Sequence, residues 1–167
     1  MESRRAFITT SVLTGLTLLA PSVSKSKSLE INFIQDKPKP IDLVLVKDFV
    51  ISSHGNLQKV KELLEKESEL VNATWDWGGG DFETGMNAAG HTGRVEIAEF
   101  LLSQGARMDI FCAAMLGKLD IVKSILDVYP TLKSSKGPHG LMLLHHATKG
   151  GENAIPVLNY LKEIGAS

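Results

Sequence analysis

The chain has 167 residues, the length of one small domain, and its 43% hydrophobic content is sufficient to fill a core. The formal net charge is −1, which argues against a nucleic-acid partner, since that calls for a strongly basic surface. Because Cys112 is the only cysteine, no internal disulfide can form, and its small apolar neighbours predict a buried, unreactive thiol.

We predict that residues 1–24 form an export signal and are not part of the folded domain. Arg4 and Arg5 precede an uncharged, largely apolar run at 9–20, and small residues follow it. This order is typical of a secretory signal peptide. The paired arginines followed by Phe7 resemble the twin-arginine export signal, and a Sec signal is the alternative. Either implies a bacterial protein that is periplasmic or secreted. We expect no membrane attachment after cleavage, because the run is shorter than the roughly 20 residues that span a bilayer.

Residues 25–41 are predicted to be a linker. They begin with lysines and serines and end with alternating lysine and proline at 37–40. Because proline fixes its own φ and cannot donate the helical hydrogen bond, this composition favours an extended tether.

The remaining residues, 42–167, are predicted to form a domain of paired helices. Apolar residues recur there at helical spacing. Helices of about ten residues are marginal alone in water, so they must stack and cover each other's apolar faces. The predicted pairs are 42–53 with 57–66, 85–91 with 95–103, 109–116 with 119–128, and 141–149 with 154–164.

One pattern occurs four times along this domain: a glycine, several polar residues, and an apolar pair that ends a helix. A period of this length indicates a repeat architecture. The second unit, TGMNAAGHTGRVEIAEFLLSQGA, resembles the ankyrin repeat, and the fourth unit matches it again. The resemblance implies an all-α ankyrin-repeat solenoid of about four helix-turn-helix units. The repeat glycines are Gly55, Gly93, Gly117 and Gly151, and the matching positions are Thr84, Ala89, Gly93, Ile97, Leu101, Leu102, Gly105 and Ala106, then Gly140, Leu144, His145, Ala147 and Gly151.

The longest interval between repeat glycines contains an enlarged finger at 72–84. It carries both tryptophans of the chain, Trp75 and Trp77, with three acidic residues and three consecutive glycines. Tryptophan is enriched among the residues that dominate binding energy, so the finger is the first candidate for a contact surface. The alternative is that Trp75, Trp77 and Phe82 pack over the first repeat and only complete the fold.

The resemblance to ankyrin repeats also implies a concave binding face. In that family the two positions before each repeat glycine and the fingers line the groove. The predicted face of this chain, including the tryptophan finger, comprises Trp75, Asp76, Trp77, Asp81, Glu83, His54, His91, Thr92, Met115, Leu116, His139 and Lys149. His145 matches the family's structural histidine, and His146 beside it is expected to be partly exposed.

From the family we expect a non-enzymatic, monomeric module that binds an unidentified protein partner and holds no cofactor or metal. The alternative is a small-molecule or metal-binding protein, including a hydrolase, that uses His54, His91, Asp81 and Glu83. Imidazole and carboxylate groups hold zinc or move protons, but no local ligand spacing such as HExxH supports this site. A third hypothesis is a structural partner that stabilises or masks an enzyme exported beside it.

Overall fold

The computed structural model describes residues 38–166, and every element below belongs to the compact unit that begins at Lys39. The predicted export signal and most of the predicted linker lie outside the described residues. None of the helices in the described part is long and apolar enough to cross a membrane.

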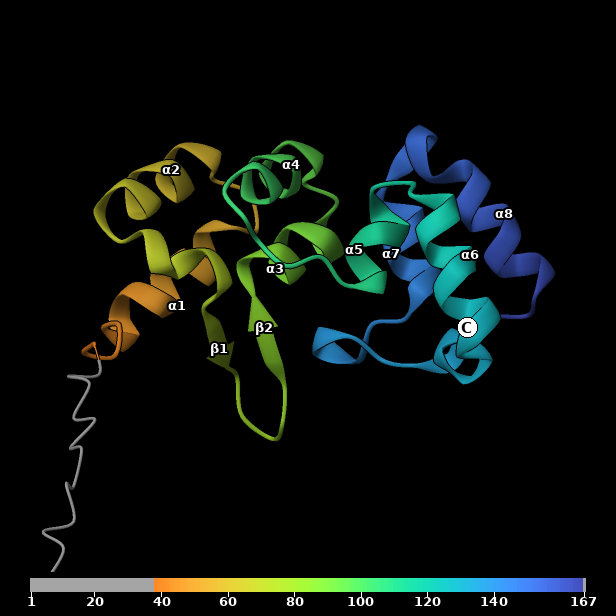
Figure 1. The fold of residues 1–167 in the computed structure, drawn as a ribbon, viewed down its shortest axis with the longest axis horizontal. Helices are drawn as coiled ribbons and strands as arrows, with labels where there is room; N and C mark the ends of the chain where they lie inside the picture. Colours follow the sequence, from red (N-terminus) through yellow and green to blue (C-terminus); the bar gives the residue numbers. More distant parts are fainter. Residues whose placement is uncertain (1–37, 167) are drawn as a thin grey trace, which may run out of the picture. The chain divides into compact units, whose positions relative to one another are not determined.

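The described chain is mainly helical, as predicted, and its helices come in four consecutive pairs (Figure 1). The α-helices are α1 (Leu43–Ser52), α2 (Leu57–Lys66), α3 (Gly85–Thr92), α4 (Val95–Ser103), α5 (Ile110–Met115), α6 (Leu119–Val128), α7 (Leu143–Lys149) and α8 (Ile155–Glu163). A two-stranded sheet of β1 (Thr74–Asp76) and β2 (Phe82–Thr84) lies between α2 and α3, at the predicted finger. The 3-10 turns are η1 (Ser68–Asn72), η2 (Pro130–Ser134), η3 (Pro138–Gly140) and η4 (Gly151–Ala154).

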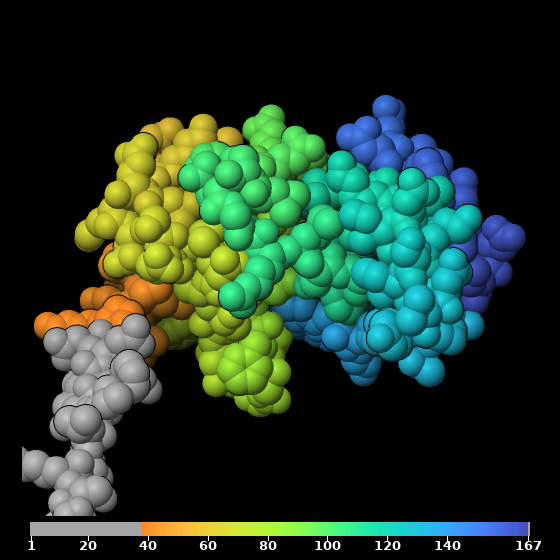
Figure 2. Space-filling model, viewed as in Figure 1, coloured from red at the N-terminus to blue at the C-terminus, as the bar shows by residue number. Residues whose placement is uncertain are grey.

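The helices form two rows. In one row α1, α3, α5 and α7 contact one another in that order, and each packs against the helix that follows it in the chain. Helix α3 also contacts α7, because the six-residue α5 is too short to separate them completely. The hairpin of β1 and β2 projects beyond the helices and is drawn in yellow-green in Figure 2.

Small residues let the inner helices approach one another closely. Helix α3 carries Ala88, Ala89 and Gly90, and a Cβ atom at Gly90 would stand 2.8 Å from the sulfur of Cys112 on α5. The thiol is buried, as predicted, and this burial raises the pKa of Cys112. Helix α3 ends at Gly93, whose φ of 73° is the left-handed conformation that commonly closes a helix.

The apolar faces of the helices form two clusters of buried side chains. The first is centred on α1 to α4 and includes Phe49, Leu70 and Leu101. The second is centred on α5 to α8 and includes Leu143 and Leu161. All five are fully buried, and they come from α1, η1, α4, α7 and α8.

Three predictions of exposure are wrong at the helices α5 and α7. Met115 and Leu116, predicted to line the binding face, are 0% and 7% exposed. They lie at the end of α5, which is enclosed between α3 and α7, and Gly150 packs directly against the Met115 carbonyl. His146 on α7 is 1% exposed. These side chains belong to the core and cannot contact a partner.

Leu101→Ala is expected to lower the free energy of unfolding by about 2–5 kcal/mol, because it removes a fully buried side chain and leaves a cavity. The matched control is Leu43→Ala on α1, where the side chain is 69% exposed and a change within about 0.5 kcal/mol is expected. Urea unfolding of the two variants measures both changes. Equal losses would place Leu101 outside the core.

Candidate metal centre

The hairpin presents one face to the helices. Strands β1 and β2 pair antiparallel with Trp75 opposite Glu83, so these two side chains point to the same side. Gly78, Gly79 and Gly80 close the turn with positive φ values of 98°, 65° and 88°, a conformation that favours glycine. Because this turn fixes the register of the strands, the alternation of side chains directs Glu83 toward the helices.

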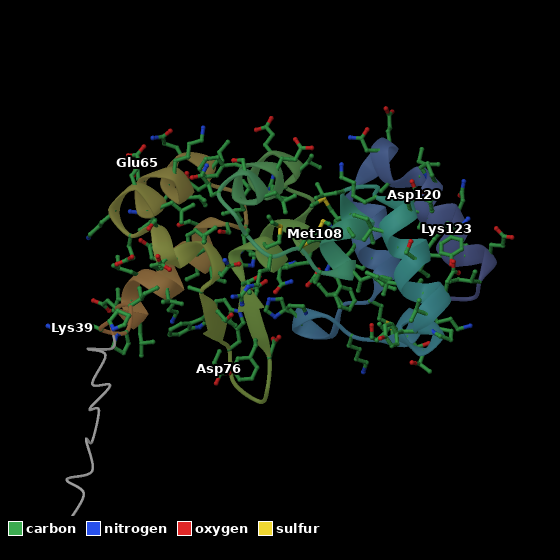
Figure 3. All side chains as sticks on the ribbon, viewed as in Figure 1. Lys39, Glu65, Asp76, Met108, Asp120 and Lys123 are labelled. Carbon is green, nitrogen blue, oxygen red and sulfur yellow. The ribbon has the colours of Figure 1, made fainter. Side chains whose placement is uncertain are left out.

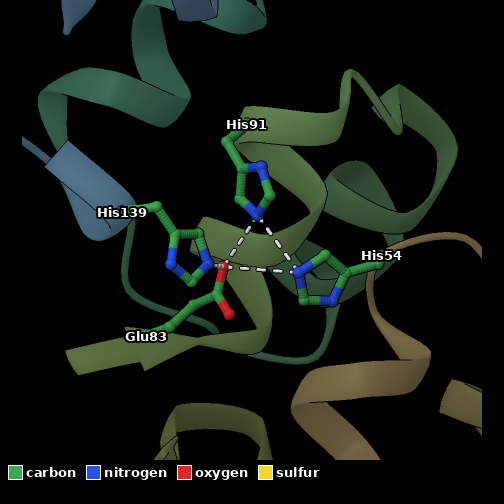
Figure 4. A group of neighbouring side chains, drawn as sticks. All are labelled: His54, Glu83, His91 and His139. Atoms are coloured by element: carbon green, nitrogen blue, oxygen red, sulfur yellow. Dashed lines mark hydrogen bonds and ion pairs between the residues drawn. The ribbon is translucent and has the colours of Figure 1, made fainter. Parts of the chain in front are cut away.

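Four side chains from separate segments meet at this face. His54 lies in the turn after α1, Glu83 on β2, His91 in the last turn of α3, and His139 in η3. One donor atom from each residue lies within 4.8 Å of the donor atoms of the other three. Figure 4 shows the three imidazole rings approaching from different sides, with the Glu83 carboxylate between their inner edges.

The shortest separations in this cluster involve Oε1 of Glu83. It lies 2.8 Å from Nε2 of His91, 3.3 Å from Nε2 of His139 and 3.6 Å from Nε2 of His54. The Nε2 atoms of His54 and His91 are 3.1 Å apart. Two donors bound to one zinc ion at about 2.0–2.1 Å stand about 2.9–3.4 Å apart for bond angles between a right angle and the tetrahedral value. These four separations are therefore close to those of a coordination shell, and all the donor atoms lie within 4.8 Å of one another.

The four side chains differ in depth. Glu83 is 0% exposed, the His91 side chain 13%, His54 30% and His139 33%. The prediction that Glu83 lies on an exposed face is therefore wrong, because the hairpin turns its side chain inward against the helices. An ionised carboxylate at this depth requires positive charge or hydrogen-bond donors around it.

The outer nitrogens of two histidines already have partners. Nδ1 of His54 lies 3.0 Å from the carbonyl oxygen of Val50, and Nδ1 of His139 lies 2.7 Å from Oδ2 of Asp81. Both partners only accept hydrogen bonds, so each Nδ1 carries a proton and donates it. In a neutral ring the Nε2 lone pair then points inward. Outer hydrogen bonds of this kind orient nearly all histidines that bind metals.

Asp81 also fixes the backbone that carries His139. Its Oδ1 accepts a hydrogen bond from the His139 main-chain N–H at 2.8 Å. His139 has a φ of 58°, a left-handed conformation that few residues other than glycine adopt. The hydrogen bonds from His139, first that of the backbone, hold the pKa of Asp81 below its ordinary value of 3.8 despite partial desolvation. Asp81 is thus a negative charge that aims the His139 ring at the cluster.

Trp77 is hydrogen-bonded to the second carboxylate oxygen of Glu83. Its indole N–H donates to Oε2 over 2.8 Å. Oε1 receives no hydrogen bond of suitable direction, although Nε2 of His91 is close. Burial on its own would raise the pKa of Glu83, but the contacts with His91 and Trp77 and the nearby imidazole of His54 outweigh it, so the pKa lies below the ordinary 4.5. Glu83 is therefore ionised at neutral pH, with one oxygen directed at the histidines.

The cluster concentrates electron pairs in a small volume. The Nε2 lone pairs of His54 and His139 face the anionic Oε1 of Glu83, and such atoms repel one another unless positive charge lies among them. Nε2 of His91 lies 3.1 Å from Nε2 of His54 and 2.8 Å from Oε1 of Glu83, so it can donate a hydrogen bond to either of them, whereas a bound cation would supply positive charge to all four donors at once. Three imidazole nitrogens and one carboxylate oxygen are ligands that zinc accepts, so the donor set fits a metal ion.

Trp75 and Asp76 lie on the hairpin but outside the cluster. Trp75 packs edge-on against Trp77, with ring centroids 6.4 Å apart, and Nζ of Lys47 lies 5.2 Å from the Trp75 ring centroid. Asp76 accepts a hydrogen bond from the N–H of Gly78 at 2.7 Å and lies toward the far end of the hairpin (Figure 3). These contacts stabilise the hairpin without reaching the histidines.

Thr92 and Lys149 also remain outside the cluster. The Thr92 hydroxyl donates to the carbonyl of Ala88 within α3, and Lys149 is exposed at the end of α7. Nε2 of His145 lies 2.9 Å from the carbonyl oxygen of His91. His145 therefore braces the backbone of a cluster residue, which agrees with the structural role predicted for it.

The cluster differs in membership from the His/carboxylate site that was the alternative prediction from the sequence. That hypothesis placed His54, His91, Asp81 and Glu83 on one surface and left His139 to the general binding face. In the structure His139 is the fourth cluster member, and Asp81 stands behind it. The sequence around His139 contains no motif of metal ligands. It was placed on the predicted binding face only because it lies in the finger of the fourth predicted unit.

Comparison with known proteins gives the cluster no precedent. The chain matches no family model, no curated protein and no solved structure. The likeness to ankyrin repeats therefore stays a prediction, and the function has to be argued from the geometry of the four side chains.

Asp81→Ala is expected to weaken zinc binding about 10- to 100-fold, because it removes the acceptor that orients His139 without removing a donor. Competition between the protein and a chelating dye measures the affinity. The matched control, Asp120→Ala, alters an exposed residue of α6 well away from the hairpin (Figure 3) and should bind zinc like the unaltered protein. Equal affinities for all three proteins would show that Asp81 has no role in the site.

Proposed function

We propose that this protein binds a divalent first-row transition-metal ion, with zinc the expected ion, through His54, Glu83, His91 and His139. One observation carries the proposal: three Nε2 atoms and one buried carboxylate oxygen converge within 4.8 Å, while the outer polar atoms of three of these side chains already have partners. In those three side chains only the inward-facing atom remains available, and the four separations of 2.8, 3.1, 3.3 and 3.6 Å among the donors are close to those of metal ligands.

The donor types decide which ion the site prefers. Calcium and magnesium favour shells built wholly of oxygen, and Mg²⁺ keeps several of its waters. Three of the four donors here are imidazole nitrogens, which suit zinc, copper, iron, cobalt and nickel. Zinc is the expected occupant because it readily takes four nitrogen and oxygen ligands in a roughly tetrahedral arrangement.

The ion would join segments that are far apart in the chain. His54 follows α1, and Glu83 lies just before α3. His91 lies in the last turn of α3, and His139 lies before α7. A ligand that binds only the folded state adds its binding free energy to stability. At a free zinc concentration about 100 times the dissociation constant, that contribution is about 2.7 kcal/mol. The proposed ion would therefore cross-link helix pairs that are distant in sequence and stabilise the fold.

The helical array itself is proposed to be an ankyrin-repeat solenoid of four units. The order of the helix pairs, the small residues of the inner row and the glycine that ends α3 support this proposal. The departures from the family pattern are the short α5 and the strand-free segment between α4 and α5.

A second candidate function is protein binding through the hairpin. It is favoured by two aromatic side chains near the turn, Trp77 and Phe82, which are 39% and 58% exposed. The two functions can be separated at Phe82, because side chains alternate along β2 and Phe82 therefore points to the face opposite Glu83. A surface function would be weakened in Phe82→Ser, whereas zinc binding would be kept.

The test of the proposed function is the metal content of the purified protein. We expect one zinc ion per chain, a higher melting temperature with zinc, and a fall in that temperature after chelation, because the ion binds only the folded state. His91→Gln should lose both the ion and the response to chelator, since His91 lies at the centre of the donor set.

The control for this test is Lys149→Gln, which changes an exposed residue at the end of α7 that lies outside the cluster. This variant should keep the ion. A protein that binds no added zinc, or a His91→Gln variant that binds it as tightly as the control does, would exclude the site.

A further inference from the structure

Only one oxygen of Glu83 is free to reach an ion. Oε2 accepts the indole N–H of Trp77 over 2.8 Å, and Oε1 faces the histidines. With Oε2 held in this way, the carboxylate binds through a single oxygen. The protein then supplies four donors, and an ion such as zinc or cobalt can add a fifth ligand when there is space beside it.

The four donors do not enclose the ion position equally. Glu83 is completely buried on one side, whereas the His54 and His139 side chains remain 30% and 33% exposed. Water therefore reaches two of the three rings that would bind the ion. Trp77, whose ring centroid lies 6.1 Å from that of His139 and which is itself 39% exposed, forms a wall beside this open side.

The charge at the site favours an anion as the added ligand. A divalent ion held by three neutral imidazoles and the Glu83 carboxylate keeps one positive charge. The nearby carboxylate of Asp81 does not neutralise the ion directly, because both of its oxygens accept hydrogen bonds from His139. A bound cation of this kind is the largest local charge, and it attracts anionic oxygen.

We infer that the metal ion has an exchangeable coordination position on the side of His54 and His139, and that this position takes small anions, namely hydroxide or the oxygen of a carboxylate or phosphate group. The inference rests on the metal-binding function proposed above. It makes the site one that binds a ligand through the metal rather than a closed structural centre. Trp77 is a positioning residue, because it keeps the second oxygen of Glu83 away from the ion.

Cobalt substitution tests this inference, because the visible absorption of Co²⁺ changes with its coordination. The full chain is stripped of metal, loaded with Co²⁺ and titrated with acetate and, separately, with inorganic phosphate. We expect the cobalt bands to change and to saturate with at least one of these anions. A response to acetate alone or to phosphate alone identifies which oxygen donor the position prefers, and either response supports the inference.

Two negative results have different meanings. If Co²⁺ binds with one ion per chain but neither anion alters its spectrum, the shell is closed and the inference is overturned while the proposed function stands. If neither Co²⁺ nor Zn²⁺ binds, the metal-binding function fails and the inference fails with it.

The role of Trp77 is tested with two matched variants. In Trp77→Phe the second oxygen of Glu83 is released and can close on the ion, so Co²⁺ should still bind while anion affinity falls about tenfold or more. Trp75→Phe alters the other tryptophan of the hairpin, which pairs across the strands with Glu83 but leaves Oε2 bonded to Trp77. It should respond like the unaltered protein. Equal anion affinity in both variants would contradict the positioning role of Trp77.

Discussion

Glu83 places an ionised carboxylate where water does not reach it, and the surrounding residues must provide the stabilisation that water would otherwise give. Trp77 donates a hydrogen bond to one oxygen, and three histidines surround the other. Two of those histidines are arranged with their outer nitrogens protonated, so they offer lone pairs to an anion. A cation among these donors would compensate their negative charge and lone pairs, and this supports the proposed metal site.

The succession of helix pairs explains how residues so distant in sequence reach one point. His54 stands one position before Gly55 and His91 two positions before Gly93, so both lie near the end of the first helix of successive helix pairs. Stacking of these helices brings the two side chains together, and their ring centroids are 4.9 Å apart. The enlarged finger then inserts Glu83 between them, and the turn before α7 adds His139. The scaffold thus supplies two donors by repetition and two by irregular segments.

Much of this arrangement could be predicted from the sequence, and the reasons for the successes are physical. Helical periodicity and the repeat glycines gave the helix pairs, because burial of an apolar stripe depends on local spacing. The same register placed His54 and His91 on one surface. Glu83 could be located on the finger but its burial could not, because that depends on how the glycine turn directs the side chain against α3.

Other parts of the site depend on contacts between distant segments, which leave no recognisable pattern in the local sequence. His139 lies in an irregular segment without periodicity, and its left-handed backbone is held by Asp81 from a different repeat. Met115 and Leu116 were predicted to face the groove because they are the two positions before the repeat glycine Gly117. In this chain α5 is short and α7 closes against its end, so both side chains enter the core.

The most direct test of the central claim is a crystal structure of the zinc-loaded protein with diffraction measured on both sides of the zinc absorption edge. The account predicts one anomalous peak bound to Nε2 of His54, His91 and His139 and to Oε1 of Glu83, with Zn–N distances of about 2.0–2.1 Å. Oε2 of Glu83 should remain bonded to Trp77. Two results would contradict the proposed metal site. One is a zinc peak elsewhere on the molecule, and the other is a cluster whose four side chains contain no ion in excess zinc.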